Sequence, residues 1–293
     1  MSKKSNKYAG DQPAAYDPTG VSEYLGLGRP IDFDKKPVRI AMMCAVAISV
    51  VVTLWKCSTG MDSGAAVVSA LGYALSFLFS YMLALELDPD RQLGGFIGGG
   101  LTLIATYFMG EGNILVMLWL LFILRMLNRS SGDRHRLIDN VIMIGSAAWL
   151  GLQGLWVFPL LTGAAYILES QIQVGYFRSL YLAGISLACL IFAKYDTVAN
   201  ELSMSNIIIM ALAFILFLPE IRVADYVKSK GDKNGKRLLP KRLQTMQGYF
   251  CMMLFSLTFL HGNAIVPSLM PAVGAAAGCG IYLFVALLKH EVF

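Results

Sequence analysis

The sequence predicts an all-α protein, and specifically a polytopic transmembrane helical bundle. Of its 293 residues 56% are hydrophobic and 15% are charged, whereas a soluble domain carries about 25% charged and under about 50% apolar residues. The charges are also clustered, since residues 40–55 and 64–85 contain none. A soluble fold of this length has too little interior to bury such an excess, so lipid must supply the remaining apolar environment.

The chain contains ten rather short apolar segments, which are expected to be its transmembrane spans. A helix rises about 1.5 Å per residue, so a hydrocarbon core of about 30 Å needs close to twenty residues. The stretch 139–169 is too long for one upright span and short for two, and it is expected to form a helical hairpin that turns near residues 152–159. The expected spans are 39–56, 64–86, 93–109, 112–128, 139–152, 156–169, 178–193, 204–221, 246–261 and 264–288.

The distribution of Lys and Arg supports this number of spans. With a hairpin at 139–169, 22 of the 24 basic residues fall on one side, and only Lys56 and Lys194 fall on the other. With a single span there, the division becomes 13 against 11. Because positive residues concentrate on the cytoplasmic side, the sequence predicts ten spans, both termini in the cytoplasm and no external domain. A plasma (inner) membrane is the expected location.

Residues 1–38 are expected to form a cytoplasmic arm ahead of the bundle, which covers residues 39–293. More than thirty mostly polar residues precede the first apolar segment, so no cleavable signal peptide is expected. Tyr24, Leu25 and Leu27 are apolar anchors between turn residues, which indicates that the arm docks under the bundle or onto a partner. The five cysteines are scattered singly, without the spacing of metal ligands, and no metal or other cofactor is expected.

Charged side chains at the cytoplasmic ends of spans two to five form a candidate site. Carboxylates could hold a magnesium ion and guanidinium groups a phosphate, as in a lipid headgroup, and His135 could act as an acid or base near neutral pH. The candidate lipid-headgroup or phosphate-binding residues are Asp88, Asp90, Arg91, Arg125, Arg129, Arg134, His135 and Arg136.

A structural interpretation of the same residues stays open. Asp88, Asp90 and Arg91 flank Pro89, and this pattern ends a helix. On this interpretation Arg91 or Arg129 pairs with one of the carboxylates, and pairs so exposed contribute about 0–1 kcal/mol. The cluster lacks the second acidic motif of membrane prenyltransferases and the Asp-Gly and Ala-Arg pattern of alcohol-phosphatidyl transferases.

A basic loop between the eighth and ninth expected spans is a candidate contact for an anionic leaflet. Each such charge contributes on the order of 1 kcal/mol near anionic lipid. Nucleic acid is not an expected partner, because no aromatic residues interleave these charges. The loop residues are Lys228, Lys230, Lys233, Lys236, Arg237, Lys241 and Arg242.

The interior of the spans carries little chemistry. Every Asp and Glu lies at a segment end or in a loop, whereas ion-coupled carriers usually need a charge near the midplane. The pairs Gly94/Gly98 and Gly274/Gly278 are spaced for close helix packing. Three functions remain: a non-catalytic subunit or scaffold of a membrane assembly, which is favoured; an enzyme or binding protein for a phosphorylated lipid; and a carrier for a neutral or lipid-like solute. Whether the protein is an enzyme stays open.

Overall fold

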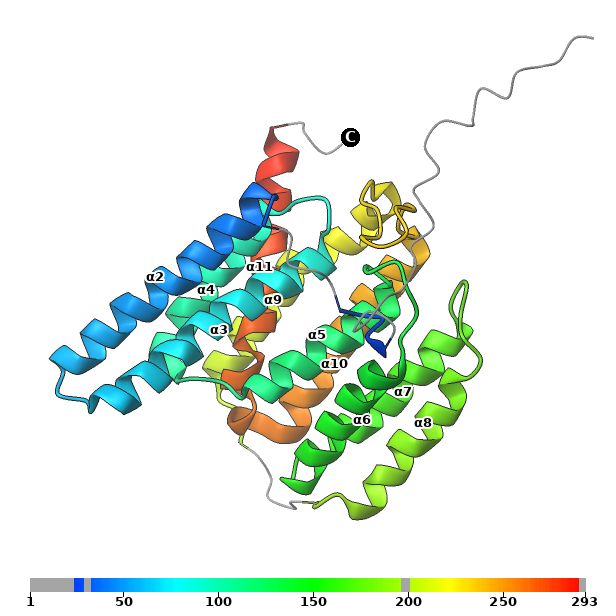
Figure 1. Cartoon of the computed structure of the whole chain (residues 1–293), viewed down its shortest axis with the longest axis horizontal. Helices are drawn as coiled ribbons and strands as arrows, with labels where there is room; N and C mark the ends of the chain where they lie inside the picture. Colours follow the sequence, from blue (N-terminus) through cyan, green and yellow to red (C-terminus); the bar gives the residue numbers. More distant parts are fainter. Residues whose placement is uncertain (1–23, 29–32, 196–200, 290–293) are drawn as a thin grey trace, which may run out of the picture.

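The computed structural model describes residues 24–28, 33–195 and 201–289, and this part of the chain forms ten α-helices and no extended strand (Figure 1). The helices are α2 (Lys36–Ser58), α3 (Ser63–Leu87), α4 (Leu93–Met109), α5 (Ile114–Asn128), α6 (Leu137–Leu152), α7 (Val157–Gln171), α8 (Ser179–Ala188), α9 (Met204–Val223), α10 (Pro240–His261) and α11 (Val266–Leu288).

Four helices are long and apolar enough to cross a membrane by length and composition. They are α2, α3, α11, and α9 with the short turn that follows it. Helices α4, α5, α6, and α8 with its 3-10 extension Cys189–Phe192 are apolar but shorter. The all-helical class predicted from the sequence is confirmed, and the apolar lengths of these four helices make membrane association plausible.

Two helices occupy the stretch 139–169, as predicted. Helix α6 has 16 residues and α7 has 15. Between them Gly154 adopts a φ of +96°, a conformation that costs glycine little but most side chains more. Pro159 lies in the first turn of α7, where its missing N–H breaks no helical hydrogen bond.

Helix α10 begins earlier than the sequence predicted. The expected span started at residue 246, but the helix starts at Pro240, which is at its first position. The fixed φ of proline suits the first turn of a helix. As a consequence Arg242, assigned from the sequence to a lipid-facing loop, is buried with 2% of its surface exposed.

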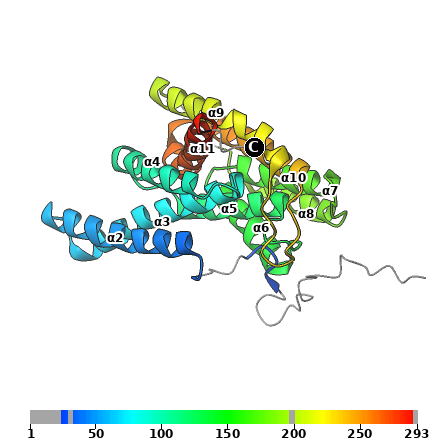
Figure 2. The same cartoon turned by 90° about the horizontal axis from the view of Figure 1, so that it is seen from above.

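The helices fall into two neighbouring groups (Figures 1 and 2). Helices α2, α3, α4, α9 and α11 lie on one side, and α5, α6, α7, α8 and α10 lie on the other. Helix α5 is central because it packs against α3, α6, α7, α10 and α11. Its Trp119 is fully buried and donates its indole N–H to Thr162 Oγ1 of α7 at 2.8 Å.

Glycines allow α4 and α11 to approach closely. A Cβ added at Gly98 would lie 2.7 Å from the carbonyl oxygen of Gly274, and one added at Gly278 would lie 2.4 Å from the carbonyl oxygen of Gly94. These distances are shorter than carbon and oxygen atoms tolerate, so the contact of the two backbones depends on glycine.

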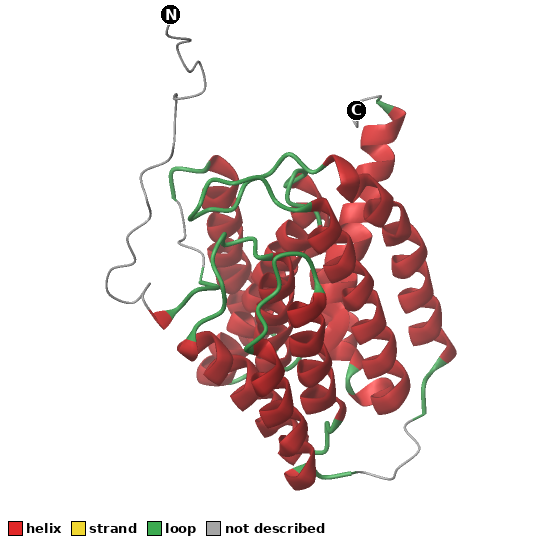
Figure 3. Cartoon of the chain, turned by 90° about the vertical axis from the view of Figure 1, so that its right-hand side faces the viewer, coloured by secondary structure: helices red, strands yellow, loops and turns green. Residues whose placement is uncertain are grey.

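The helix connections gather at the two ends of the bundle (Figure 3). We call one of them the ionic end; it contains the loops 88–92, 129–136, 172–178 and 224–239. Hydrogen bonds join these loops: Ser229 N donates to Asp90 Oδ1 at 2.8 Å, and Lys233 N donates to Ser131 O at 2.9 Å. The opposite end carries short turns, where Asn113 N donates to Ser268 Oγ at 2.9 Å.

Candidate functional site

Charged side chains from six helices and two loops form a layer beneath the ionic end of the bundle. Most of them are buried, and they make contacts across the chain rather than along one helix. We call this set the ionic layer, and its members are Glu86, Asp88, Arg91, Arg125, Arg129, Asp139, Glu169, Glu220 and Arg242.

Arg125 forms a closed ion pair with Glu86. Its Nε donates to Glu86 Oε1 at 3.0 Å, and the two side chains are 11% and 0% exposed. Asn128, one turn further along α5, donates to the carbonyl oxygen of Glu86 at 3.4 Å. The pair joins the C-terminal ends of α3 and α5. Arg125 therefore satisfies its charge inside the protein, one turn within the apolar segment.

Arg91 lies between two carboxylates. Its Nη1 donates to Asp88 Oδ2 and to Glu220 Oε2, both at 3.0 Å. The contact ties the α3–α4 loop to α9, 129 residues away. Burial raises the pKa of Asp88 above its usual range, although the charge of Arg91 opposes this shift. Arg91 thus pairs with a carboxylate of the 86–91 cluster as predicted, but the pair is not exposed, because the Asp88 and Arg91 side chains are 6% and 15% exposed.

Glu169 of α7 forms ion pairs with two arginines. Arg129 Nη2 donates to Glu169 Oε1 at 2.6 Å, and Arg242 Nη2 donates to Glu169 Oε2. Arg242 also donates to the carbonyl oxygens of Leu127 at 3.0 Å and Met126 at 3.2 Å. Carbonyls in the last turn of a helix have no partner within the helix, so Arg242 caps α5 while it pairs with Glu169.

Asp139 holds the N-terminal arm against the bundle. Its Oδ2 accepts the backbone N–H of Gly26 at 2.7 Å and of Arg136 at 2.8 Å. The side chain of Leu27 is fully buried. Lys233 donates to the carbonyl oxygen of Gly26 at 2.9 Å. Residues 24–28 therefore dock against the bundle, which is one of the two placements predicted for the arm. Residues 1–23 and 29–32 lie outside the described residues.

His135 is enclosed rather than open to a substrate. Its Nε2 lies 2.9 Å from Ser179 Oγ, and its ring packs edge-on against Tyr166 and Tyr176. Burial, together with the weaker effect of neighbouring arginines, lowers the pKa of His135 to about 4. The lowered pKa favours the neutral form of the ring at physiological pH, and the acid or base role of His135 stays a prediction.

The remaining candidates lie nearer the surface of the ionic end. Arg136 pairs with Asp133 at 2.7 Å, with side chains 24% and 26% exposed. The exposed Arg134 places its guanidinium carbon 5.1 Å from the centroid of the Tyr176 ring. Asp90 accepts the backbone N–H groups of Lys228 and Ser229, both at 2.8 Å. Asp90 thus fastens the basic loop to the α3–α4 loop.

The expected grouping of carboxylates and arginines forms only in part. Glu86 meets Arg125, and Asp88 meets Arg91, but Arg129 pairs with Glu169 and not with the 86–91 cluster. The cavity beside Asp88, Asp90 and Arg91 has a volume of about 10 Å³, which is the space of roughly one water molecule. Among the described residues no cluster of three or more His, Cys, Asp or Glu side chains could hold a metal ion.

Sequence reasoning missed the far partners in this layer, which are Glu169, Glu220 and Arg242. Each lies at the end of a helix facing the ionic end. An acid at the end of an apolar segment, and an arginine two residues after a proline, are signals that could have marked them.

Comparison of the chain with family models, with curated proteins and with solved structures found no match.

Proposed function

We propose that this chain is an integral membrane protein and serves as a non-catalytic subunit or scaffold of a membrane assembly. The observation that carries the proposal is the closed pair of Arg125 and Glu86 at 3.0 Å. Arg125 is the arginine set deepest in an apolar segment, and its charge is used to join two helices. Because this guanidinium is paired with Glu86, it supports a structural role for Arg125.

The other members of the ionic layer support the same function. The carboxylates of Glu169, Glu220 and Asp139 each accept hydrogen bonds from groups on distant segments. Removing one partner of a buried pair leaves an uncompensated charge, so such a layer favours one fixed arrangement of helices. A fixed arrangement with broad apolar faces suits a protein that organises others in the membrane. On α2, for example, Val46, Val51 and Leu54 are 63%, 64% and 66% exposed.

The proposed topology has ten crossings, with both termini and the ionic end in the cytoplasm of a cell whose plasma (inner) membrane holds the protein. We expect reporter fusions after residues 60, 111, 155, 198 and 262 to lie outside, and fusions after residues 90, 132, 173 and 235 to lie inside. The reason is the excess of Lys and Arg on the loops of the ionic end. A reporter fused after residue 235 and found on the outer side of the membrane would overturn the ten-span topology.

The proposed subunit role is tested by isolating the protein from its own membrane in a mild detergent. We expect it to co-purify with other membrane proteins at a fixed stoichiometry. Chemical cross-linking before solubilisation should preserve that ratio, and the chain reconstituted alone should show no saturable, magnesium-dependent binding of inorganic phosphate or phosphatidic acid. A solitary chain that binds magnesium and phosphate would contradict the proposal.

A phosphorylated lipid at the ionic end is the second candidate function. Arg134 favours it, because its exposed guanidinium stacks on Tyr176 beside the basic loop. Lys228, Lys236 and Lys241 remain candidates for contact with anionic lipid, whereas Arg242 belongs to the ionic layer. If the reconstituted chain binds phosphatidic acid, loss of that binding in Arg134→Gln, with unchanged helix content, would establish this alternative over the scaffold.

A further inference from the structure

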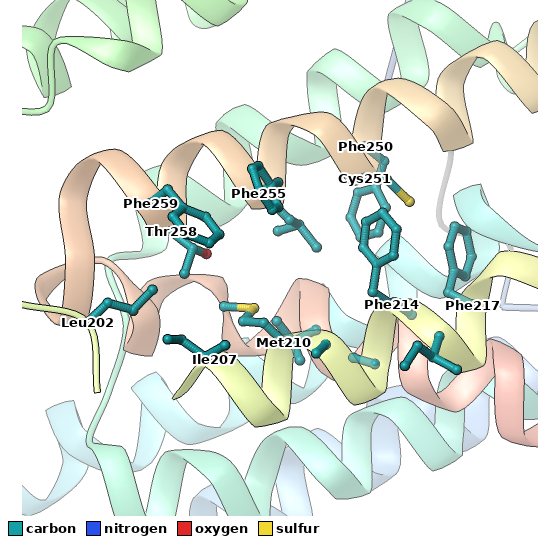
Figure 4. Close-up of a pocket in the computed structure, with 16 residues that line it drawn as sticks. Leu202, Ile207, Met210, Phe214, Phe217, Phe250, Cys251, Phe255, Thr258 and Phe259 are labelled. Atoms are coloured by element: carbon teal, nitrogen blue, oxygen red, sulfur yellow. The ribbon is translucent and has the colours of Figure 1, made fainter. Parts of the chain in front are cut away.

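An apolar groove lies between α9 and α10, with α11 as its floor. Helix α9 packs against α11 and makes few contacts with α10. This leaves a space of about 360 Å³ between α9 and α10 (Figure 4). Phenylalanine side chains from both helices line it, including Phe214, Phe217, Phe250 and Phe255. Thr258 provides the one hydroxyl group among the lining residues.

The dimensions of the groove suit one alkyl chain. From Ile207 to Phe217 the lining residues follow α9 for about 15 Å, at 1.5 Å per residue. This length is close to half of the bilayer core of about 30 Å, which is the depth that one leaflet contributes.

A helix of a partner protein does not fit this space. A helix with its side chains is at least about 10 Å wide, and α9 already packs against α11 along the floor of the groove. Entry of a helix would require α9 to leave α11, against which it packs closely: a Cβ added at Gly280 would lie 2.2 Å from the carbonyl oxygen of Leu216. A single chain of methylene groups enters without such a change.

Thr258 indicates which end of the ligand is polar. It is 2% exposed, and its Oγ1 has no hydrogen-bond partner among the described residues. A buried hydroxyl without a partner is unfavourable in apolar surroundings. Thr258 lies three residues before the end of α10 at His261, about 5 Å from the end opposite the ionic end. At this depth the ester carbonyl of a glycerolipid would accept a hydrogen bond from the Thr258 hydroxyl. The acyl chain of the lipid would then extend past the phenylalanines toward the middle of the bundle.

We infer that the groove between α9, α10 and α11 binds one acyl chain of a glycerolipid, whose ester carbonyl accepts a hydrogen bond from the Thr258 hydroxyl. The headgroup then lies at the end of the bundle opposite the ionic end. This lipid is a structural ligand that fills the gap between α9 and α10, and it does not depend on the proposed subunit role.

Native mass spectrometry of the full chain tests the inference with two matched variants. Ala211 lines the groove and is exposed toward it, so Ala211→Trp would fill the space without repacking a core. Leu212 is the next residue on α9, is 56% exposed and lies outside the lining. After reconstitution in vesicles of diacyl phosphatidylethanolamine and phosphatidylglycerol and extraction in mild detergent, we expect one retained lipid in the wild type and in Leu212→Trp. Retention should fall at least tenfold in Ala211→Trp.

The hydroxyl is tested separately with Thr258→Val, which keeps the shape of the side chain and removes the donor. Retention of diacyl lipid should fall about fivefold, the loss expected for one hydrogen bond. Retention of a dialkyl ether analogue, which has no carbonyl, should not change. Helix content by circular dichroism checks the folding of each variant. Equal retention in Ala211→Trp and Leu212→Trp would overturn the groove as the site, and equal loss of ester and ether lipids in Thr258→Val would overturn the hydrogen bond.

Discussion

Replacing Glu169 by glutamine is expected to destabilise the bundle by about 3–5 kcal/mol, the range for breaking a buried ion pair by removal of one partner. The carboxylate accepts hydrogen bonds from Arg129 at 2.6 Å and from Arg242, and it is fully buried. The amide of glutamine has one acceptor oxygen and no charge, so both guanidinium groups would lose their counter-charge. Thermal denaturation in detergent micelles, followed by circular dichroism, measures the loss.

Asp133→Asn is the matched control for this prediction. Asp133 also pairs with an arginine, Arg136, but the two side chains are 26% and 24% exposed. Exposed pairs contribute about 0–1 kcal/mol, so this variant should unfold close to the temperature of the wild type. If Glu169→Gln lost no more stability than Asp133→Asn, charge balance in the ionic layer would not hold the helices together.

A double-mutant cycle separates the Glu169–Arg242 contact from the other effects of each change. Arg242→Met alone removes the caps on the carbonyls of Leu127 and Met126 as well as the pair. Because the two residues touch, the combined change should cost at least about 1 kcal/mol less than the sum of the single changes. Additive losses would show that the two side chains act independently.

The helix positions were largely predictable because long apolar helices carry a strong local signal. Helix α4 occupies residues 93–109 as expected, and α3 extends the predicted 64–86 by one residue at each end. Asp62 accepts the N–H of Gly64 where α3 begins, and Asp88 precedes Pro89 where it ends. These signals lie within a few residues of the helix ends, so they can be recognised without knowing which distant segments pack together.

The ion pairs were not predictable in the same way, because their partners are far apart in the chain. Arg242 and Glu169 are separated by 73 residues, and Arg91 and Glu220 by 129. Topology explains why the charges share one end of the bundle, but it does not decide which arginine meets which acid. The sequence therefore indicated the ionic end correctly and misjudged its burial: a layer expected to be largely exposed is mostly enclosed by the loops and by Leu27 of the arm.

Replacing Gly98 by valine is expected to separate α4 from α11 and to prevent stable folding of the helix group that contains them. A Cβ at this position would lie 2.7 Å from the carbonyl oxygen of Gly274 and 3.0 Å from the Cα of Ala275. Both neighbours are backbone atoms, which cannot turn aside as a flexible side chain can. Overpacking usually costs about 1–3 kcal/mol, and we expect valine to reach or exceed the upper value because two rigid helices must move.

Gly100 supplies the matched control for this prediction on the same helix. A Cβ at Gly100 has no atom within 4 Å of it, so Gly100→Val changes helix propensity as Gly98→Val does, without the clash. The alanine variants at these two positions should change the stability of the protein in opposite directions. Gly100→Ala should stabilise α4 by up to about 1 kcal/mol, because alanine favours the helix over glycine. Gly98→Ala should destabilise the protein because its methyl group meets Gly274. Thermal denaturation in micelles measures all four variants. If Gly98→Val and Gly100→Val unfolded alike, α4 and α11 would not pack through these glycines in the membrane, and the close contact between the two helices would have to be abandoned.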